Sequence, residues 1–329
     1  MKSFEWVQAQ SLDEAIAQLA PGVMLKAGGV DLIDRLKEGI DAPRRVVNLH
    51  GIAGLDGIEP HAASTGGALA LGPLATLAQI AAHREVRGRW PALAEACAHA
   101  ATPQIRNMAT IGGNLVQRPR CWYFRSADFH CKKKGGATCY ALAGENQFHA
   151  IVGNGLCAIV HPSSIATALV AYGATVTLKG KRGERVVALE QFFAPPEKDV
   201  TRENVLGADE LIAAVTVPAP AAGTRAAYHK QVEKESFDWP MADVAVVLAM
   251  NGRTCTRASI VLGAAAPVPW RAAAAEALLG GRVVDERAAE AAANAAMQGM
   301  TPLAQNGYKL PVFRAVIRRT ILAAVGGAA

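Results

Sequence analysis

Residues 23–37 read VMLKAGGVDLIDRLK, and this stretch decides the fold. A short apolar run, VMLK, leads into two glycines, and VDLIDRLK then has the apolar spacing of a helix. Upstream, Ser11 is a predicted helix N-cap with Glu14 three residues later, a capping-box pattern. Downstream, RRVVNL at residues 44–49 reads as another strand. The order predicts a βαβ-type layered subdomain over residues 1–56 rather than a helical bundle.

Two further groups of elements follow this unit. Residues 57–220 alternate strands and helices and include a second glycine loop, TIGGNL, at 110–115. The passage PAPAAGT then indicates a domain boundary. Beyond it, residues 221–329 contain strand-like segments, a helix predicted to begin near Pro240, and three helical segments. The predicted fold class is α+β, with two α/β subdomains and a C-terminal α+β domain.

The composition is that of a soluble globular protein. The chain has 329 residues, of which 51% are hydrophobic and 19% charged, and no apolar run approaches the roughly 20 residues that span a bilayer. The N-terminus MKSFEWVQAQSLDEA lacks the organisation of a signal peptide. We therefore expect a cytoplasmic protein, or a periplasmic one that is exported together with a signal-bearing partner.

Four cysteines lie in one basic, aromatic stretch at about residues 118–158, separated by nine, seven and seventeen residues. They are Cys121, Cys131, Cys139 and Cys157. Four thiolates can hold an iron–sulfur cubane or a structural metal, and the spacing is too loose for the CxxC hairpins of zinc ribbons. From the residues alone a cluster, a zinc site and free thiols all remain open. Cys97 and Cys255 lie in helical and strand-like patterns and are predicted to be buried small hydrophobes.

The net charge of +6 is concentrated around these cysteines. A nucleic-acid surface is one interpretation, but no recognisable binding module accompanies it. Cations beside anionic cofactors explain the cluster better. The two glycine loops, KAGGVDL and TIGGNL, expose backbone N–H groups that suit phosphate, although neither matches GxGxxG or a P-loop. Together they could bind both phosphates of a dinucleotide; plain tight turns are the alternative.

Seven segments in order along almost the whole chain carry a family resemblance. They are AGGVDLIDRLK, VNLHGIAGL, LGPLATLAQIA, TPQIRNMATIGGNL, HPSSIATALVAYGA, HKQVEKESFDWPMADVAV and IVLGAAAPVPWRA. Together they resemble the FAD-binding (medium) subunit of molybdenum hydroxylases, the group of xanthine dehydrogenase, aldehyde oxidoreductase and carbon monoxide dehydrogenase. The cysteine insertion is similar to that of the bacterial periplasmic aldehyde oxidoreductases, where it ligates a [4Fe–4S] cluster.

The resemblance implies a vanillyl-alcohol-oxidase-like fold of two subdomains with non-covalent FAD between them, followed by a carbon-monoxide-dehydrogenase-flavoprotein-like α+β domain. It places Ile212 against the isoalloxazine and Lys230 near the flavin ring, and it puts Ser164 where relatives commonly have aspartate. The cofactor-binding residues that it implies are Lys26, Ala27, Gly28, Gly29, Val30, Asp31, Leu32, Thr110, Gly113, Asn114, Gln117, Arg118, Ser164, Ile212 and Lys230.

For the four clustered cysteines, the resemblance implies that they ligate a [4Fe–4S] cluster, with Trp122, Tyr123 and Phe124 packed around it. The function that it implies is an electron-transfer subunit of a heterotrimer, an aldehyde oxidoreductase. A small [2Fe–2S] subunit and a large molybdenum-cofactor subunit are the expected partners, and an external acceptor takes the electrons. The alternatives are the FAD subunit of a xanthine or other N-heterocycle dehydrogenase, a stand-alone FAD oxidoreductase, and a non-catalytic metal-stapled binding module.

Overall fold

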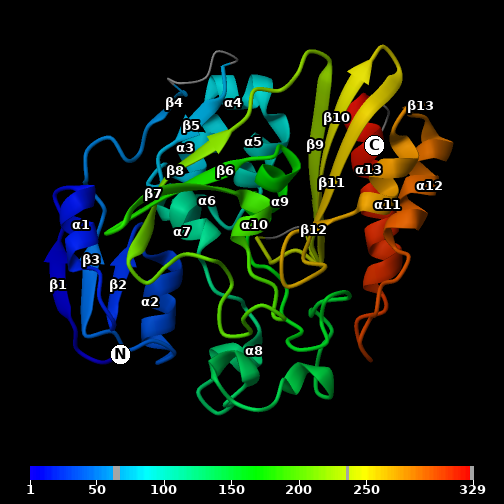
Figure 1. The fold of residues 1–329 in the computed structure, drawn as a ribbon. Coiled ribbons are helices and arrows are strands. Elements are labelled where there is room, and N and C mark those ends of the chain that lie inside the picture. The colour runs from blue at the N-terminus through cyan, green and yellow to red at the C-terminus, as the bar shows by residue number, and fades with distance from the viewer. Residues whose placement is uncertain (62–66, 235–236, 327–329) are drawn as a thin grey trace.

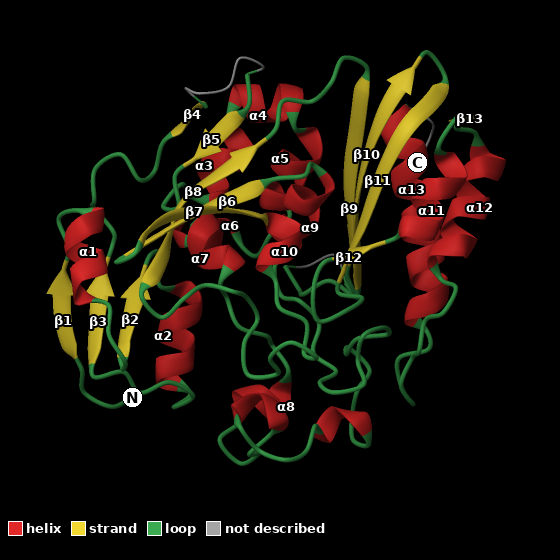
Figure 2. Cartoon of the chain, viewed as in Figure 1, coloured by secondary structure: helices red, strands yellow, loops and turns green. Residues whose placement is uncertain are grey.

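The computed structural model describes residues 1–61, 67–234 and 237–326. Figure 1 shows sheets with their own helices succeeding one another from the blue N-terminal end to the yellow and red C-terminal end. Below them lies a lobe around α8 that consists mostly of loops (Figure 2). Within the described residues, no helix is long and apolar enough to cross a membrane.

The N-terminal sheet has three parallel strands in the order β1-β3-β2. Its strands and helices are β1 (Glu5–Gln8), α1 (Leu12–Gln18), β2 (Val23–Lys26), α2 (Val30–Lys37) and β3 (Arg45–Asn48). The Ser11 hydroxyl accepts the Glu14 N–H at 3.1 Å, which confirms the predicted N-cap. The sequence patterns missed β1, because its residues have no apolar alternation: Val7 is its only residue that is not exposed.

The second sheet has five strands in the order β4-β5-β8-β6-β7. The strands are β4 (Ile58–Pro60), β5 (Leu69–Leu71), β6 (Thr175–Gly180), β7 (Gly183–Ala188) and β8 (Glu210–Val217). All their pairings are antiparallel. The helices of this part are α3 (Leu77–Ala82), α4 (Arg84–Arg89), α5 (Pro91–Ala98), α6 (Pro103–Met108), α7 (Ile111–Leu115), α9 (Ser164–Ala171) and α10 (Leu189–Phe192).

The third sheet is built on the long antiparallel strands β9 to β11. Its elements are β9 (Thr224–Gln231), β10 (Ala242–Asn251), β11 (Thr254–Gly263), β12 (Trp270–Arg271), α11 (Ala273–Leu279), β13 (Arg282–Val283), α12 (Glu286–Ala296) and α13 (Lys309–Val325). The helix predicted to begin near Pro240 is wrong, because β10 begins at Ala242. The run ADVAVVLAMN pairs with strands on both sides, so its β-branched residues form a central strand. We propose domain boundaries at 56/57 and 220/221, between the sheets.

The third sheet is covered on both faces. Tyr228, Ala245 and Val261 pack into the core that contains α5 and α9. The alternate residues, such as Val244 and Ile260, pack with α11, α12 and α13. Burial on both faces explains why β10 and β11 read as nearly continuous apolar runs. Any charged residue in these strands is therefore removed from water and needs a physical explanation.

The cysteine insertion has little regular structure. It contains α8 (Trp122–Arg125) and two 3₁₀ turns, Lys132–Lys134 and Tyr140–Leu142. A small aromatic cluster that includes Tyr123 and Ala141 is its own core. Both of the remaining cysteines, Cys97 and Cys255, are completely buried in the cores of the other parts, as predicted.

Lys309, the first residue of α13, ties the insertion to the C-terminal domain. Its side chain is completely buried. The ammonium donates to the carbonyl of His149 at 3.1 Å and to that of Ala264 at 2.5 Å. Burial lowers the pKa of Lys309 to about 7, with the charge of Asp243 acting in the opposite direction. Two carbonyls and a distant carboxylate therefore do not fully replace water around this cation.

The pH dependence of stability should report this lysine. An unfolded lysine keeps its proton up to about pH 10, whereas Lys309 loses its proton above about pH 7 in the folded chain. Between these values the unfolded state binds more protons, so stability should rise with pH, by about 5 kcal/mol at most. Lys309→Met should flatten this part of the stability–pH curve in urea unfolding. Lys37→Met, at an exposed position, should leave it unchanged, and an identical slope in wild type and Lys309→Met would contradict the assignment.

Candidate functional site

The first glycine loop lies between β2 and α2, and it packs directly on another backbone segment. A Cβ built on Gly28 would stand 1.8 Å from the carbonyl oxygen of Met108, so only glycine fits there. Gly29 has a φ of +83°, in the left-handed region, and serves as the N-cap of α2 without a side chain to cap it. The first N–H groups of α2 therefore lack a side-chain cap and are available to a ligand.

The second glycine loop starts at the end of α6 and forms the short helix α7. The Thr110 hydroxyl accepts the N–H of Gly113 at 3.3 Å and caps this turn. A Cβ on Gly112 would meet Pro73 at 2.9 Å, so this loop is also held against a neighbouring backbone. Asn114 is fixed by the Ser163 hydroxyl, which donates to its Oδ1 at 2.5 Å. Two loops from different subdomains thus meet with their backbones close together.

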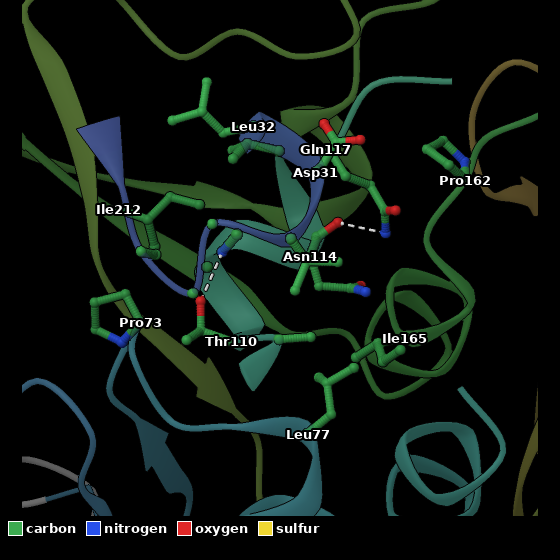
Figure 3. Close-up of a pocket in the computed structure, with 18 of the residues that line it drawn as sticks. Asp31, Leu32, Pro73, Leu77, Thr110, Asn114, Gln117, Pro162, Ile165 and Ile212 are labelled. Atoms are coloured by element: carbon green, nitrogen blue, oxygen red, sulfur yellow. Dashed lines mark hydrogen bonds between the residues drawn. The ribbon is translucent and has the colours of Figure 1, made fainter. Parts of the chain in front are cut away.

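A cavity of about 710 Å³ lies between the two loops. This volume is within the range of cofactor sites. Figure 3 shows Thr110 and Asn114 on one loop, with Ile212 and Ile165 contributing apolar side chains from other elements. Segments that are far apart in the sequence line it together: α2, α7, β8, the start of α9, β9 and residues 237–240.

Thirteen of the fifteen predicted cofactor-binding residues line this cavity. They are Ala27, Gly28, Gly29, Val30, Asp31, Leu32, Thr110, Gly113, Asn114, Gln117, Ser164, Ile212 and Lys230. The other two, Lys26 and Arg118, do not. The Lys26 ammonium bonds Asn48 Oδ1 at 3.1 Å and lies over the Trp6 ring. Arg118 is ion-paired with Glu203 instead, and Arg120 lines the cavity two residues later.

The cavity fits a dinucleotide such as FAD. The uncapped N-terminus of α2 and the close-packed glycines provide backbone donors where phosphates can approach. Leu77, Ile165 and Ile212 provide apolar walls. Lys230 contributes a cation whose Nζ donates to the His99 carbonyl at 3.1 Å, and burial lowers its pKa. Because burial disfavours the charged form of Lys230, negative charge that develops in the cavity would stabilise the protonated lysine.

Asp31, in the first turn of α2, joins the cavity to the cysteine insertion. Its Oδ1 accepts from Arg125 at 2.7 Å and forms an ion pair with Arg120 at 2.9 Å. Its Oδ2 accepts from the backbone N–H of Arg118 and forms an ion pair with Arg35, both at 3.1 Å. Burial acts to raise the pKa of Asp31, but Arg120 and Arg35 hold it below its ordinary value. The carboxylate is thus a fixed charge that connects the first glycine loop with residues 118–125.

A second carboxylate holds the insertion from the other side. Glu203 accepts from Arg118 at 3.0 and 3.1 Å, a bidentate pair. It also pairs with the Lys133 ammonium at 2.9 Å, and the Lys133 side chain is only 2% exposed. Lys133 in turn lines the pocket of the cysteines.

The four clustered cysteines line one small pocket, together with Tyr123 and Phe124. Trp122 lies outside this pocket, edge-on to the His149 ring. Among the described residues, no three His, Cys, Asp or Glu side chains are arranged as ligands of a single metal ion. The His149 ring nitrogen Nε2 lies 3.2 Å from the sulfur of Cys121. Burial lowers the pKa of His149 to about 4, so the ring is neutral at pH 7.

The electrostatics of the pocket favour a thiolate at Cys139, whereas burial raises the pKa of Cys121 to about 11. A hydrogen bond from Cys157 lowers the pKa of Cys139 to about 6, against the effect of burial. Backbone N–H groups of Ala158, Ala141 and Leu142 act in the same direction on Cys139. The pKa of Cys157 is raised by this bond and by burial. Backbone N–H groups directed at sulfur, next to the Lys133 ammonium, are the surroundings that an anionic cysteine-bound cluster needs.

The four cysteine side chains are therefore suitable ligands for a cluster, but the pocket between them is too small to contain one. The pocket volume is only about 10 Å³. A cluster in this pocket would require the cysteine side chains to move apart and the Cys139–Cys157 hydrogen bond to break.

The sequence patterns missed one charged residue beside the cavity. Ser164 provides no carboxylate, yet the structure brings the buried carboxylate of Asp243 next to it from β10. Asp243 lies within an otherwise apolar strand, and this was the signal that could have identified it.

Comparisons with known proteins agree with this geometry. The family profile described as the FAD-binding domain in molybdopterin dehydrogenase matches residues 2–220, and that of the CO dehydrogenase flavoprotein C-terminal domain matches residues 226–324. An aldehyde oxidoreductase FAD-binding subunit of Escherichia coli, PaoB, is 35% identical over 94% of this chain and 94% of its own length.

More distant relatives show the same fold. The carbon monoxide dehydrogenase medium chain of Hydrogenophaga pseudoflava is 27% identical over 98% of this chain and 96% of its own. A solved structure of that organism's carbon monoxide dehydrogenase superposes with a TM-score of 0.77 at 29% identity, covering 100% of this chain and 99% of its own. The predicted fold class, the family resemblance and FAD as cofactor are confirmed.

In Gly28→Ala the new Cβ would overlap the Met108 carbonyl oxygen. The variant should therefore bind FAD about tenfold more weakly or worse, or it should fail to fold. Gly88→Ala is the matched control, since a Cβ there meets nothing within 4 Å and the residue lies in α4. The control should be neutral or slightly stabilising. FAD affinity is measured by titrating apoprotein and following flavin fluorescence. Equal affinities for the two variants would contradict the close-packing argument.

Asp31→Asn should lower both FAD affinity and stability, because it leaves the arginines that converge on this carboxylate without their shared partner. A cost on the order of 3 kcal/mol is expected in urea unfolding. Asp34→Asn removes a carboxylate that pairs with Arg120 and Arg125 but is 52% exposed, and it should cost less than about 1 kcal/mol. Similar losses in the two variants would show that Asp31 has no special role.

Proposed function

Because the chain belongs to the family of FAD-binding subunits of molybdopterin dehydrogenases, we propose that it is the FAD- and [4Fe–4S]-containing electron-transfer subunit of an aldehyde oxidoreductase. The family places it among FAD-dependent oxidoreductase subunits. The aldehyde substrate and the cluster are our proposal. Two observations together support this proposal. Four cysteines line one pocket, and ion pairs connect their insertion to the flavin cavity.

Each part of the cavity has a separate task in this function. FAD, when bound, supplies the two-electron carrier. The glycine loops would position its phosphates through backbone N–H groups, and Ile212 provides part of the apolar wall of the cavity. Lys230 holds a positive charge at the cavity wall, which favours negative charge developing there.

The cysteines have the chemistry for the cluster that we propose. Cys121, Cys131, Cys139 and Cys157 would hold it, and the thiolate form that ligation needs is favoured at Cys139. Tyr123 and Phe124 exclude water from the pocket, and Lys133 offsets negative charge. A [4Fe–4S] cluster in such a pocket would supply one-electron transfer. The aldehyde assignment follows the relative of 35% identity, which is named an aldehyde oxidoreductase subunit.

We propose that the partners are a small [2Fe–2S] subunit and a large molybdenum-cofactor subunit. Relatives are named as a medium chain and as an FAD-binding subunit, which are names for parts of larger assemblies. Electrons would pass from those partners to FAD and then to an external acceptor. We propose a cytoplasmic location, or export to the periplasm together with a signal-bearing partner.

Iron and flavin analysis of the purified complex tests the proposal. Wild type should contain about four iron atoms and one FAD in this subunit. Cys139→Ser should lose about four iron atoms and the visible absorption of this one cluster, while it keeps FAD and the iron of the [2Fe–2S] partner. Cys255→Ser changes a cysteine buried in the C-terminal core and should keep both. A subunit that carries zinc, or no metal, would overturn the cluster and leave the flavin function standing.

Turnover by the isolated chain tests the alternative of a stand-alone enzyme. The FAD-loaded chain without partners should not oxidise aldehydes, because the proposed substrate site lies on the large subunit. Aldehyde oxidation by the chain alone would contradict the proposed role as a relay.

A further inference from the structure

A buried acid lies between the flavin cavity and the C-terminal sheet. Asp243 in β10 has no exposed surface at all. The Tyr228 hydroxyl donates to its Oδ2 at 2.9 Å, and the Ser164 side chain lies next to both residues. These three residues form a polar group, here called the Asp243 triad, in a junction otherwise filled by apolar side chains such as Ala245 and Val261.

The carboxyl group of Asp243 fits into the structure only because residue 263 is a glycine. A Cβ on Gly263, which is paired with Asp243 in the β10–β11 ladder, would lie 1.6 Å from Oδ1 and 2.5 Å from Thr167 Oγ1. Both of these oxygens are buried, and neither has a hydrogen-bond partner within the described part of the chain. Two unpartnered oxygens in one small space are costly. A purely structural network would be expected to satisfy them.

The triad reaches the wall of the cavity at two points. Ser164 lines the cavity at the start of α9. Lys230 also lines it and stands directly opposite Asp243 in the β9–β10 ladder. The acid is therefore one side chain away from the space that FAD occupies, and the Ser164 and Tyr228 hydroxyls provide a short path for a proton.

Charged and titratable groups surround the triad from several elements. Lys230 faces it from β9 and Lys309 from α13, while Glu95 and Cys97 in α5 lie next to Tyr228. Burial raises the pKa of Asp243, and Ser164, Tyr228 and the two lysines act against this effect. Burial favours the protonated acid, while its neighbours favour the carboxylate. A new charge in the cavity can therefore change the protonation state of Asp243.

We propose that Asp243 is a proton-accepting residue of the flavin site, which takes up one proton through Ser164 and Tyr228 when the bound flavin gains two electrons. The inference rests on the flavin part of the function and does not require the cluster. Two electrons and one proton enter the flavin, and the second proton forms an O–H bond on the Asp243 carboxylate. The added negative charge stabilises the protonated acid, and by linkage the protonated acid favours the reduced flavin.

Infrared difference spectroscopy of the FAD-loaded chain tests this directly. The spectrum after reduction with dithionite, minus the spectrum before it, should show a new band of a protonated carboxyl group over part of the range from pH 5 to 9. Asp243→Asn should lose this band. Asp56→Asn, which changes an exposed carboxylate outside the cavity lining, should keep it. Tyr228→Phe removes one hydrogen bond and should shift the band.

Proton uptake and flavin potential provide independent readouts. Over the same pH range, Asp243→Asn should take up fewer protons per flavin than wild type, by up to one. Its flavin potential should fall less steeply with pH and lie above the wild-type value at high pH, because asparagine is neutral at every pH.

Several results would overturn the inference. One is a wild-type spectrum without a new carboxyl band. This result needs no variant, so it contradicts the inference even if Asp243→Asn fails to fold or to bind FAD. Another is a band that persists in Asp243→Asn, or that Tyr228→Phe does not move. A variant that loses only stability, with unchanged proton uptake, would reveal a structural polar network. Flavin binding is measured beforehand by absorption, so a failure of the flavin function is recognised separately.

Discussion

The close contact between Gly28 and the carbonyl of Met108 is the constraint on which the rest of the structure depends. It brings the loop after β2 against the turn before α7, so that two subdomains share one cavity. Any larger residue would separate the loops and remove the backbone donors from a common ligand. The cofactor site is therefore a property of two backbones in contact, and the side chains around it adjust affinity and charge.

Ion pairs extend this arrangement into the cysteine insertion. Asp31 fixes Arg120 and Arg125 from the flavin side, and Glu203 fixes Arg118 and Lys133 from the other. A loop with so little regular structure gains its order from these buried charges and from its small aromatic core. Exposed ion pairs would contribute little, but these are largely removed from water, so losing one partner leaves a costly unpaired charge.

The junction between the second and third parts combines apolar packing with a few buried charges. Most of β10 and β11 satisfies the requirement for apolar side chains on both faces. Asp243 of β10 lies beside the flavin cavity, and Lys309, at the start of α13, is a second buried charge that lies beside the insertion. Both have shifted pKa values, because burial disfavours their charged forms. Groups of this kind respond to charge that appears nearby, which fits the electron-transfer role that we propose.

By itself, the sequence determined the local elements and the residues of the site that follow from short motifs. The Ser11 N-cap, both glycine loops and the cysteine group were readable because each depends on neighbours in the chain. Tertiary structure decided the rest. Two predicted cofactor-binding residues do not line the cavity, because Lys26 hydrogen-bonds with Asn48 and Arg118 forms an ion pair with Glu203. The strand-like run MADVAVVLAMNG formed the strand that begins at Ala242, and the helix predicted near Pro240 was wrong, because pairing on both sides fixes this segment as a central strand. Asp243 met Ser164 only through packing of α9 on the third sheet, and no spacing in the sequence encodes such a contact.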